Sequence, residues 1–219
     1  MSEPRLTRVK ICCISSREEA ALAVSCGAHA LGLVSEMPSG PGVISESLIA
    51  EIAASVPPAV GTFLLTSRQN PDAIVEQQRR CRTNTVQICD RLAPGAHARL
   101  RAAMPGIALV QVVHVMGDES IEEAKDFARS ADAILLDSGN QKLSVKELGG
   151  TGRKHDWEVS RRIREAVGIP LFLAGGLRPE NVAEAIRTVR PYAVDICSGV
   201  RSEGRLDERK LAAFFAQIT

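Results

Sequence analysis

The sequence is poor in aromatic residues, because Phe, Trp and Tyr make up only 3% of its 219 residues. Its core must therefore be built from Ala, Val, Ile and Leu. Such a core suits helices packed on a parallel sheet, whose buried strands read as continuous aliphatic runs. No apolar run approaches the roughly 20 residues that span a bilayer. The first residues also lack the apolar segment of a secretory signal, so we expect a cytoplasmic protein without a membrane anchor.

Charge and cysteine usage exclude further classes. The net charge is +1, which predicts neither a nucleic-acid partner nor a membrane-surface patch. None of the cysteines lies in a Cys-x-x-Cys pair or at zinc-ligand spacing, so no metal site is expected. A chain of this length needs no disulfides, and we interpret the thiols as reduced. The cysteines are Cys12, Cys13, Cys26, Cys81, Cys89 and Cys197.

Aliphatic runs alternate with helical patterns along the whole chain. Strands are expected at 9–13, 30–34, 59–65, 85–88, 108–114, 133–136, 170–173 and 193–196. Helices are expected at 17–26, 46–55, 71–81, 95–103, 119–129, 157–167, 180–189 and 207–217. Eight such units predict an α/β fold in which residues 1–219 form one (βα)8 barrel domain. The alternative, an open doubly wound sheet, normally carries a glycine-rich loop after its first strand, and here the glycine-rich turns come late.

Two short apolar runs near the C-terminus end in glycine and lead toward helices. They are Leu171-Phe-Leu-Ala-Gly-Gly-Leu and Tyr192-Ala-Val-Asp-Ile-Cys-Ser-Gly-Val. Glycine lets backbone N–H groups approach an anion, and barrels of this kind bind phosphate after their seventh and eighth strands. These turns predict a phosphorylated small-molecule substrate. The longest loop, 137–154, follows the sixth strand and predicts a mobile lid.

Reactive side chains of such a barrel lie at the carboxyl ends of its strands. That rule selects Cys12 or Cys13, Glu36, Cys89, Asp90, His114, Asp137 and the segment from Asp195 to Ser198. A thiol and a carboxyl group on the first and sixth strands can face each other as base and acid. The other interpretations are a small buried hydrophobe for Cys26, Cys81 or Cys89, a structural role for His114, and solvated loop carboxylates for Glu36 and Asp90.

Several motifs together resemble the phosphoribosylanthranilate isomerase family of tryptophan biosynthesis. They are Val9-Lys-Ile-Cys, Gly149-Gly-Thr-Gly, Asp156-Trp, Leu173-Ala-Gly-Gly-Leu-Arg-Pro-Glu-Asn-Val and Arg190-Pro-Tyr-Ala-Val-Asp-Ile-Cys-Ser-Gly-Val. The resemblance implies a single (βα)8 barrel without a cofactor, and an Amadori rearrangement of an aminoaldose phosphate to an aminoketose phosphate. It implies that Cys12 is the base, Asp137 the acid, and Asp195 a residue near the substrate. Phosphate would be held around Gly150, Gly152, Gly175, Gly176, Ser198 and Gly199.

Four departures from the family pattern lie toward the aromatic end of such a substrate. Cys13 stands where the family has glycine, and the loop at 35–45 has no Arg or Lys to bind the anthranilate carboxylate. Cys89-Asp90 replaces a His-Gly pair, and Gln111 replaces a lysine. Arg17, Arg68 or Arg91 are candidate substitutes for the missing cation. Isomerisation of another sugar phosphate, or binding of one without catalysis, therefore stays open. A metal-dependent aldolase or epimerase of the same fold is a weaker alternative. The chain is expected to be a monomer or a homodimer.

Overall fold

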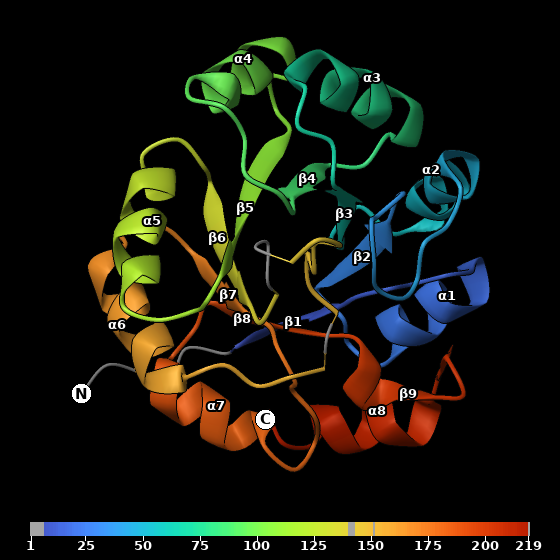
Figure 1. The fold of residues 1–219 in the computed structure, drawn as a ribbon. Helices are drawn as coiled ribbons and strands as arrows, with labels where there is room; N and C mark the ends of the chain where they lie inside the picture. Colours follow the sequence, from blue (N-terminus) through green and yellow to red (C-terminus); the bar gives the residue numbers. More distant parts are fainter. Residues whose placement is uncertain (1–6, 140–142, 151, 219) are drawn as a thin grey trace.

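Eight parallel strands pair in chain order and close into a barrel (Figure 1). The computed structural model describes residues 7–139, 143–150 and 152–218. The strands are β1 (Arg8–Ile11), β2 (Ala30–Val34), β3 (Gly61–Thr66), β4 (Thr85–Ile88), β5 (Ala108–His114), β6 (Ala133–Asp137), β7 (Leu171–Leu173) and β8 (Ala193–Ile196). The first and last strands pair with Lys10 opposite Asp195, which closes the ring. The predicted fold class is thus confirmed.

A helix follows each strand and covers the outside of the barrel (Figure 1). The helices are α1 (Arg17–Ser25), α2 (Glu46–Ser55), α3 (Pro71–Cys81), α4 (Ala96–Ala103), α5 (Glu119–Ala128), α6 (Trp157–Ala166), α7 (Val182–Val189) and α8 (Glu208–Phe215). Five begin at a side chain that accepts a hydrogen bond from the first turn, as N-cap preferences predict. These caps are Ser16, Ser45, Asn70, Asp156 and Asp207.

Some boundaries differ from those expected. Helix α7 begins at Val182 and not at residue 180, because Asn181 accepts a hydrogen bond from the Arg178 N–H at 2.9 Å and holds the preceding residues in a turn. Strand β1 ends at Ile11, and Cys13 adopts a left-handed backbone with φ of 61°. A short 3₁₀ helix η1 (Ser198–Val200) and a small hairpin of β9 (Arg201–Ser202) and β10 (Arg205–Leu206) follow β8 without having been predicted.

The core has two main layers, which fix the positions of the strand ends. Aliphatic side chains fill the space between the sheet and the helices, and a second cluster fills the barrel itself. Inside the barrel the rings of Phe63 and Phe172 pack edge to face with centroids 5.7 Å apart. The barrel is therefore packed and is not a pore, as expected for this fold.

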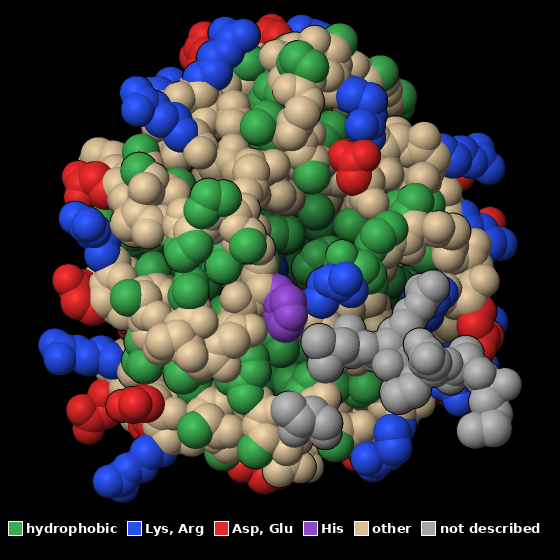
Figure 2. Space-filling model, turned by 180° about the vertical axis from the view of Figure 1, so that it is seen from behind, with side chains coloured by type: hydrophobic (Ala, Val, Ile, Leu, Met, Phe, Trp, Pro, Cys, Tyr) green, Lys and Arg blue, Asp and Glu red, His purple; other side chains and the backbone are tan. Residues whose placement is uncertain are grey.

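The two ends of the barrel differ in the side chains that they present. At the end where the strands begin, apolar side chains are spread around the centre, where a basic side chain and a histidine also lie, and most charged side chains lie at the rim (Figure 2). The opposite end carries the loops that follow the strands, and the segment 143–150 crosses in front of the barrel mouth (Figure 1). Within the described residues, no helix is long and apolar enough to cross a membrane.

Candidate active site

A pocket opens at the carboxyl ends of the strands, with a cavity volume of about 690 Å³ that includes open solvent. Residues that follow β1, β2, β4, β6, β7 and β8 contribute to its wall. The predicted site residues among them are Cys12, Asp137, Gly150, Gly152, Gly175, Gly176, Asp195 and Ser198.

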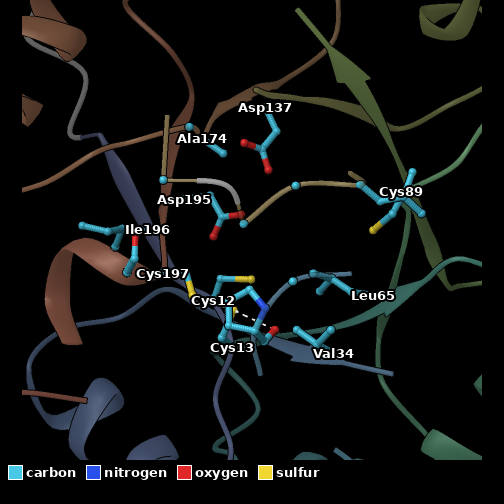
Figure 3. A pocket seen from close by; sticks show the side chains of 18 of the residues that line it. Cys12, Cys13, Val34, Leu65, Cys89, Asp137, Ala174, Asp195, Ile196 and Cys197 are labelled. Atoms are coloured by element: carbon cyan, nitrogen blue, oxygen red, sulfur yellow. Dashed lines mark hydrogen bonds between the residues drawn. The ribbon is translucent and has the colours of Figure 1, made fainter. Parts of the chain in front are cut away.

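The predicted base and acid enter the pocket from opposite sides, with Asp195 between them (Figure 3). Cys12 directly follows β1, and its N–H donates to the Ile196 carbonyl at 2.8 Å, which continues the pairing with β8. Asp137 is the last residue of β6, and its Oδ1 accepts from the Ser138 N–H at 2.7 Å. A Cβ at Gly149 would lie 2.3 Å from Asp137 Oδ2, so glycine is needed there for the loop to pass over the carboxylate.

Beneath these groups lies an ion pair between Lys10 and Asp195. Lys10 Nζ is 2.8 Å from Asp195 Oδ2, and the two side chains are 0% and 6% exposed. Burial opposes the charge on Lys10, but Asp195 and the neighbouring thiols raise the pKa of the ammonium group above its ordinary value. Burial raises the pKa of Asp195, and Lys10 opposes that shift. We assign Lys10 as protonated and Asp195 as its carboxylate partner, because a 2.8 Å charge-assisted bond stabilises both charges.

Arg201 holds the turn that carries Cys12. Its guanidinium group donates to the carbonyl oxygens of Cys12 at 3.3 Å and Cys13 at 2.6 Å. The same group bonds both carboxylate oxygens of Glu19, at 2.8 and 3.0 Å. Because the Arg201 side chain is only 8% exposed, this clamp is shielded from solvent. It joins β9 to helix α1 and to the end of β1.

The glycine turns after β7 and β8 bring backbone segments closer than side chains allow. Gly175 and Gly176 have φ of +85° and +64°, and a Cβ at Gly176 would lie within 3.0 Å of the backbone of the loop at 152–154. A Cβ at Gly199 would lie 2.2 Å from the Leu177 carbonyl oxygen. Gly199 is therefore a packing contact between the two turns, and it lies outside the residues that form the pocket wall. The other predicted phosphate-binding positions line the cavity, namely Gly150, Gly152, Gly175, Gly176 and Ser198.

Other strand-end candidates lie apart from the reacting centre or have other roles. His114 is buried, and its Nε2 lies 3.1 Å from the Cys89 carbonyl oxygen, which fits the structural interpretation. Glu36 is exposed, as expected for a loop carboxylate. Asp90 differs from that expectation, because it is buried and pairs with Lys146 at 2.6 Å. Cys89 lines the pocket, and burial raises its pKa to about 12.

The pocket wall across from the glycine turns after β7 and β8 consists mostly of uncharged side chains. Its residues are Val34, Met37, Ser39, Pro41, Leu65, Gln87, Cys89 and Leu148. Among the described residues of the whole pocket, the charged ones are Asp137 and Asp195. None of the three arginines predicted as substitutes reaches it: Arg17 lines a separate hollow beside α1, Arg68 pairs with Glu46, and Arg91 pairs with Glu123.

The predicted lid is described only in part. The Ser39 hydroxyl donates to the Lys146 carbonyl at 2.8 Å, and Leu148, Gly149 and Gly150 line the pocket. Residues 140–142 and 151 lie outside the described residues. The mobility of this loop stays a prediction. In the described part of the chain, no group of His, Cys, Asp and Glu side chains is arranged to hold a metal ion.

Fold and site together define a (βα)8 barrel whose pocket joins a thiol and a carboxyl group to glycine turns of the phosphate-binding kind. The family model described as N-(5'-phosphoribosyl)anthranilate isomerase matches residues 9–217. The chain belongs to this family. Its members are isomerases of tryptophan biosynthesis that convert an aldose-type substrate to a ketose product.

Individual relatives agree with this assignment along nearly the whole chain. The N-(5'-phosphoribosyl)anthranilate isomerase of Methanocella arvoryzae is 37% identical over 212 residues, which are 97% of each protein. The solved structure of the Thermotoga maritima enzyme has a TM-score of 0.83 and 30% identity, and the match covers 97% of this chain and 98% of that one. Another solved phosphoribosyl anthranilate isomerase, in complex with reduced 1-(o-carboxyphenylamino)-1-deoxyribulose 5-phosphate, has a TM-score of 0.80 and 28% identity with the same coverage.

Two charged residues that hold the site were not predicted from the sequence. A signal for Lys10 existed, because strand alternation places it on the same inward side as Cys12, where a buried cation needs a partner. Arg201 carried no comparable signal, because its partners are 182 and 188 residues away along the chain.

Proposed function

We propose that this chain rearranges N-(5'-phosphoribosyl)anthranilate with Cys12 as the base and Asp137 as the acid. The observation that carries this proposal is that both side chains reach one pocket from opposite sides, beside the glycine turns. Asp137 would protonate the furanose ring oxygen, and the ring would open to a Schiff base. Cys12 would then remove the proton from C2, which leads to the aminoketose. The hypothesis of binding without catalysis required both groups to lie outside the pocket, and they do not.

Placement of the acid and base is supported by the backbone around them. Cys12 lies at a strand end that Arg201 and β8 both hold, so its sulfur has little freedom to leave the pocket. Asp137 lies under Gly149 and close to His155, whose own pKa is lowered by burial although Asp137 opposes that shift. General acid–base catalysis requires such fixed groups within reach of the proton that moves.

Asp195 is suited to orient the sugar. Its Oδ2 is occupied by Lys10, whereas its buried Oδ1 has no hydrogen-bond partner among the described residues. A buried carboxylate oxygen without a donor is costly, so a substrate hydroxyl that bonds it would recover that free energy. We propose that Asp195 accepts a hydrogen bond from a ribose hydroxyl group.

We propose that the turns after β7 and β8 bind the phosphate. Gly150, Gly152, Gly175, Gly176 and Ser198 line the pocket, and η1 begins at Ser198. Barrels of this fold commonly bind phosphate at this place. The relative solved with a bound deoxyribulose 5-phosphate analogue supports a phosphorylated ligand for the family. Gly199 contributes by keeping the two turns in contact.

The organisation of the chain beyond the site is also a proposal. The pairing of β1 with β8 supports one domain over residues 1–219. A homodimer is one expected state, since a relative from Thermotoga maritima is described as dimeric, with monomers generated from it. A cytoplasmic location stays a prediction, and the six unpaired cysteines fit a reducing compartment.

Substitution of the two reacting groups tests the mechanism. Cys12→Ser and Asp137→Asn should each lower kcat by roughly 10²–10⁴-fold, since each removes one acid–base contribution. KM should change little, because the phosphate turns remain. Cys26→Ser is the matched control, since Cys26 caps α1 outside the pocket. Steady-state turnover of phosphoribosylanthranilate measures the effect, and full activity in either variant would overturn the assignment.

A further inference from the structure

Two thiols that the isomerisation does not use lie against each other at the edge of the pocket. Cys13 follows β1 and Cys197 follows β8, and their Sγ atoms are 2.6 Å apart although 184 residues separate them in the sequence. Both line the pocket, where Figure 3 shows them beside Cys12. We propose that Cys13 and Cys197 form a reversible oxidation site, at which a peroxide converts the two thiols to a disulfide that joins the turns after the first and last strands.

The geometry favours this bond over other cysteine pairings. A disulfide has an S–S distance of about 2.05 Å, so the two sulfur atoms need to approach by only about 0.6 Å. The Cys13 backbone is held in its left-handed conformation by the 2.6 Å bond from Arg201 to its carbonyl oxygen. Cys197 follows β8 directly, and the neighbouring Ile196 carbonyl is bonded to the Cys12 N–H. The backbone therefore keeps the two sulfur atoms together.

The surroundings give the two thiols different roles. The hydrogen bond between Cys197 and Cys13 lowers the pKa of Cys197 against the effect of burial, and Arg201 lowers it further. The hydrogen bonds of Cys13 to Cys12 and Cys197, together with burial, raise the pKa of Cys13. Since the thiolate is the reactive form, Cys197 is the thiol that meets the oxidant. Burial raises the pKa of Cys81 to about 12, as it does for Cys89, which disfavours oxidation at either residue.

The reaction balances with hydrogen peroxide as the oxidant. The Cys197 thiolate attacks one peroxide oxygen, the O–O bond breaks, and the sulfur becomes a sulfenic acid while hydroxide leaves and takes up a proton as water. Cys13 then loses its proton and attacks the Cys197 sulfur, the S–O bond breaks, and a second water leaves. The two thiols together lose two protons and two electrons, and the peroxide is reduced to two water molecules. A dithiol reductant reverses the change.

Mass spectrometry of the oxidised protein tests the site independently of its catalytic mechanism. The reduced protein is treated with hydrogen peroxide, its remaining thiols are blocked with N-ethylmaleimide, and it is digested with trypsin without reduction. We expect residues 11–17 joined to residues 188–201, with the loss of two hydrogen atoms, and separation of the two peptides by dithiothreitol. Because Cys12 lies in the same peptide as Cys13, Cys12→Ser must retain the link.

Two variants assign the bond to its residues. Cys13→Gly and Cys197→Ala should each lower the yield of the linked peptide at least tenfold, whereas Cys26→Ser should leave it unchanged. Glycine suits the φ of 61° at residue 13, so Cys13→Gly is expected to fold, and thermal unfolding checks this. A link that persists in Cys13→Gly, or oxidation of the wild-type protein that stops at sulfenic or sulfinic acid on Cys12, would overturn the proposal.

Discussion

The two sides of the pocket differ in what forms their surface: closely packed backbone on one side and side chains on the other. On the side of β7, β8 and β1, backbone segments approach so closely that Gly176 and Gly199 have no space for a Cβ, and a fully buried ion pair lies below. On the side of β2 to β4, the wall consists of side chains such as Met37, Leu65 and Gln87. The first side is closely packed backbone, where we have proposed that the phosphate binds. The second side sets the shape and polarity of the pocket through its side chains, so substrate specificity can change there by substitution, most readily at Met37, which is less buried than Leu65 and Gln87.

The largest difference between the sides should appear when each loses the cation of its ion pair. Lys10→Met leaves Asp195 buried without a partner, which should lower the free energy of unfolding by about 3–5 kcal/mol. Lys146→Met does the same to Asp90 on the other side, but Lys146 is 39% exposed and Lys10 is 0% exposed. Solvent therefore compensates more of that loss. Urea unfolding compares the two variants, and equal losses would contradict the contrast.

A double variant separates charge from packing at this pair. Lys10→Met combined with Asp195→Leu removes both charges and should recover part of the stability lost in Lys10→Met alone. If the double variant is no more stable than Lys10→Met, the loss comes from packing and not from an unpaired carboxylate.

A smaller effect is expected where a single methyl group enters the glycine-rich side. Gly199→Ala places a Cβ 2.2 Å from the Leu177 carbonyl oxygen, so the turns after β7 and β8 must separate. Overpacking of this kind costs about 1–3 kcal/mol. We expect a lower Tm and a higher KM, measured by thermal unfolding and steady-state kinetics. Gly168→Ala is the matched control, because a Cβ there meets no atom within 4 Å; equal behaviour of the two variants would contradict the packing argument.

The uncharged side allows a gain of function. Met37 lines the pocket on the loop after β2, and Met37→Arg would supply a cation for the anthranilate carboxylate. A hydrogen bond to a charged group contributes about 1.5–3 kcal/mol, so KM should fall by roughly tenfold or more with little change in kcat. Met37→Leu controls for the loss of the methionine. An unchanged KM in Met37→Arg would indicate that the carboxylate is bound elsewhere on this wall.

The smallest expected effect is the pH dependence of the stability that the bonds between Arg201 and Glu19 contribute beside β1. Burial raises the pKa of Glu19, but its bonds from Arg201, Leu206 and Ser15 outweigh this and lower it below the ordinary value. The clamp therefore contributes stability that is complete above the unfolded pKa near 4.3 and is lost as the pH falls through the lower folded pKa. The difference in unfolding free energy between the wild type and Glu19→Gln should shrink over that interval. A difference that is constant from pH 6 to pH 3 would contradict this account.

Prediction from sequence succeeded where the signal is local. Aliphatic runs and N-cap residues such as Ser16 and Asn70 located the eight units, because strand alternation and helix capping act within a few residues. It was weaker where partners are distant in the chain. The burial of Asp90 depends on Lys146, 56 residues away, and the Arg201 clamp depends on Glu19, 182 residues away. The motifs placed Cys12 and Asp137 at strand ends, but the cation beneath them appeared only with the closed barrel.

That closure has a consequence for biosynthesis. The base of the proposed reaction, Cys12, directly follows the first strand, and that strand pairs with the last one. Residues 8–11 can therefore pair only after residues 193–196 have been synthesised. Contacts of such large sequence separation slow folding. While the chain leaves the ribosome, Lys10 has no Asp195 to pair with, and the site does not exist until nearly the whole chain has been made. Catalytic activity in this molecule would therefore report completed barrel closure, and chains that stop before β8 would carry the base without a site for it.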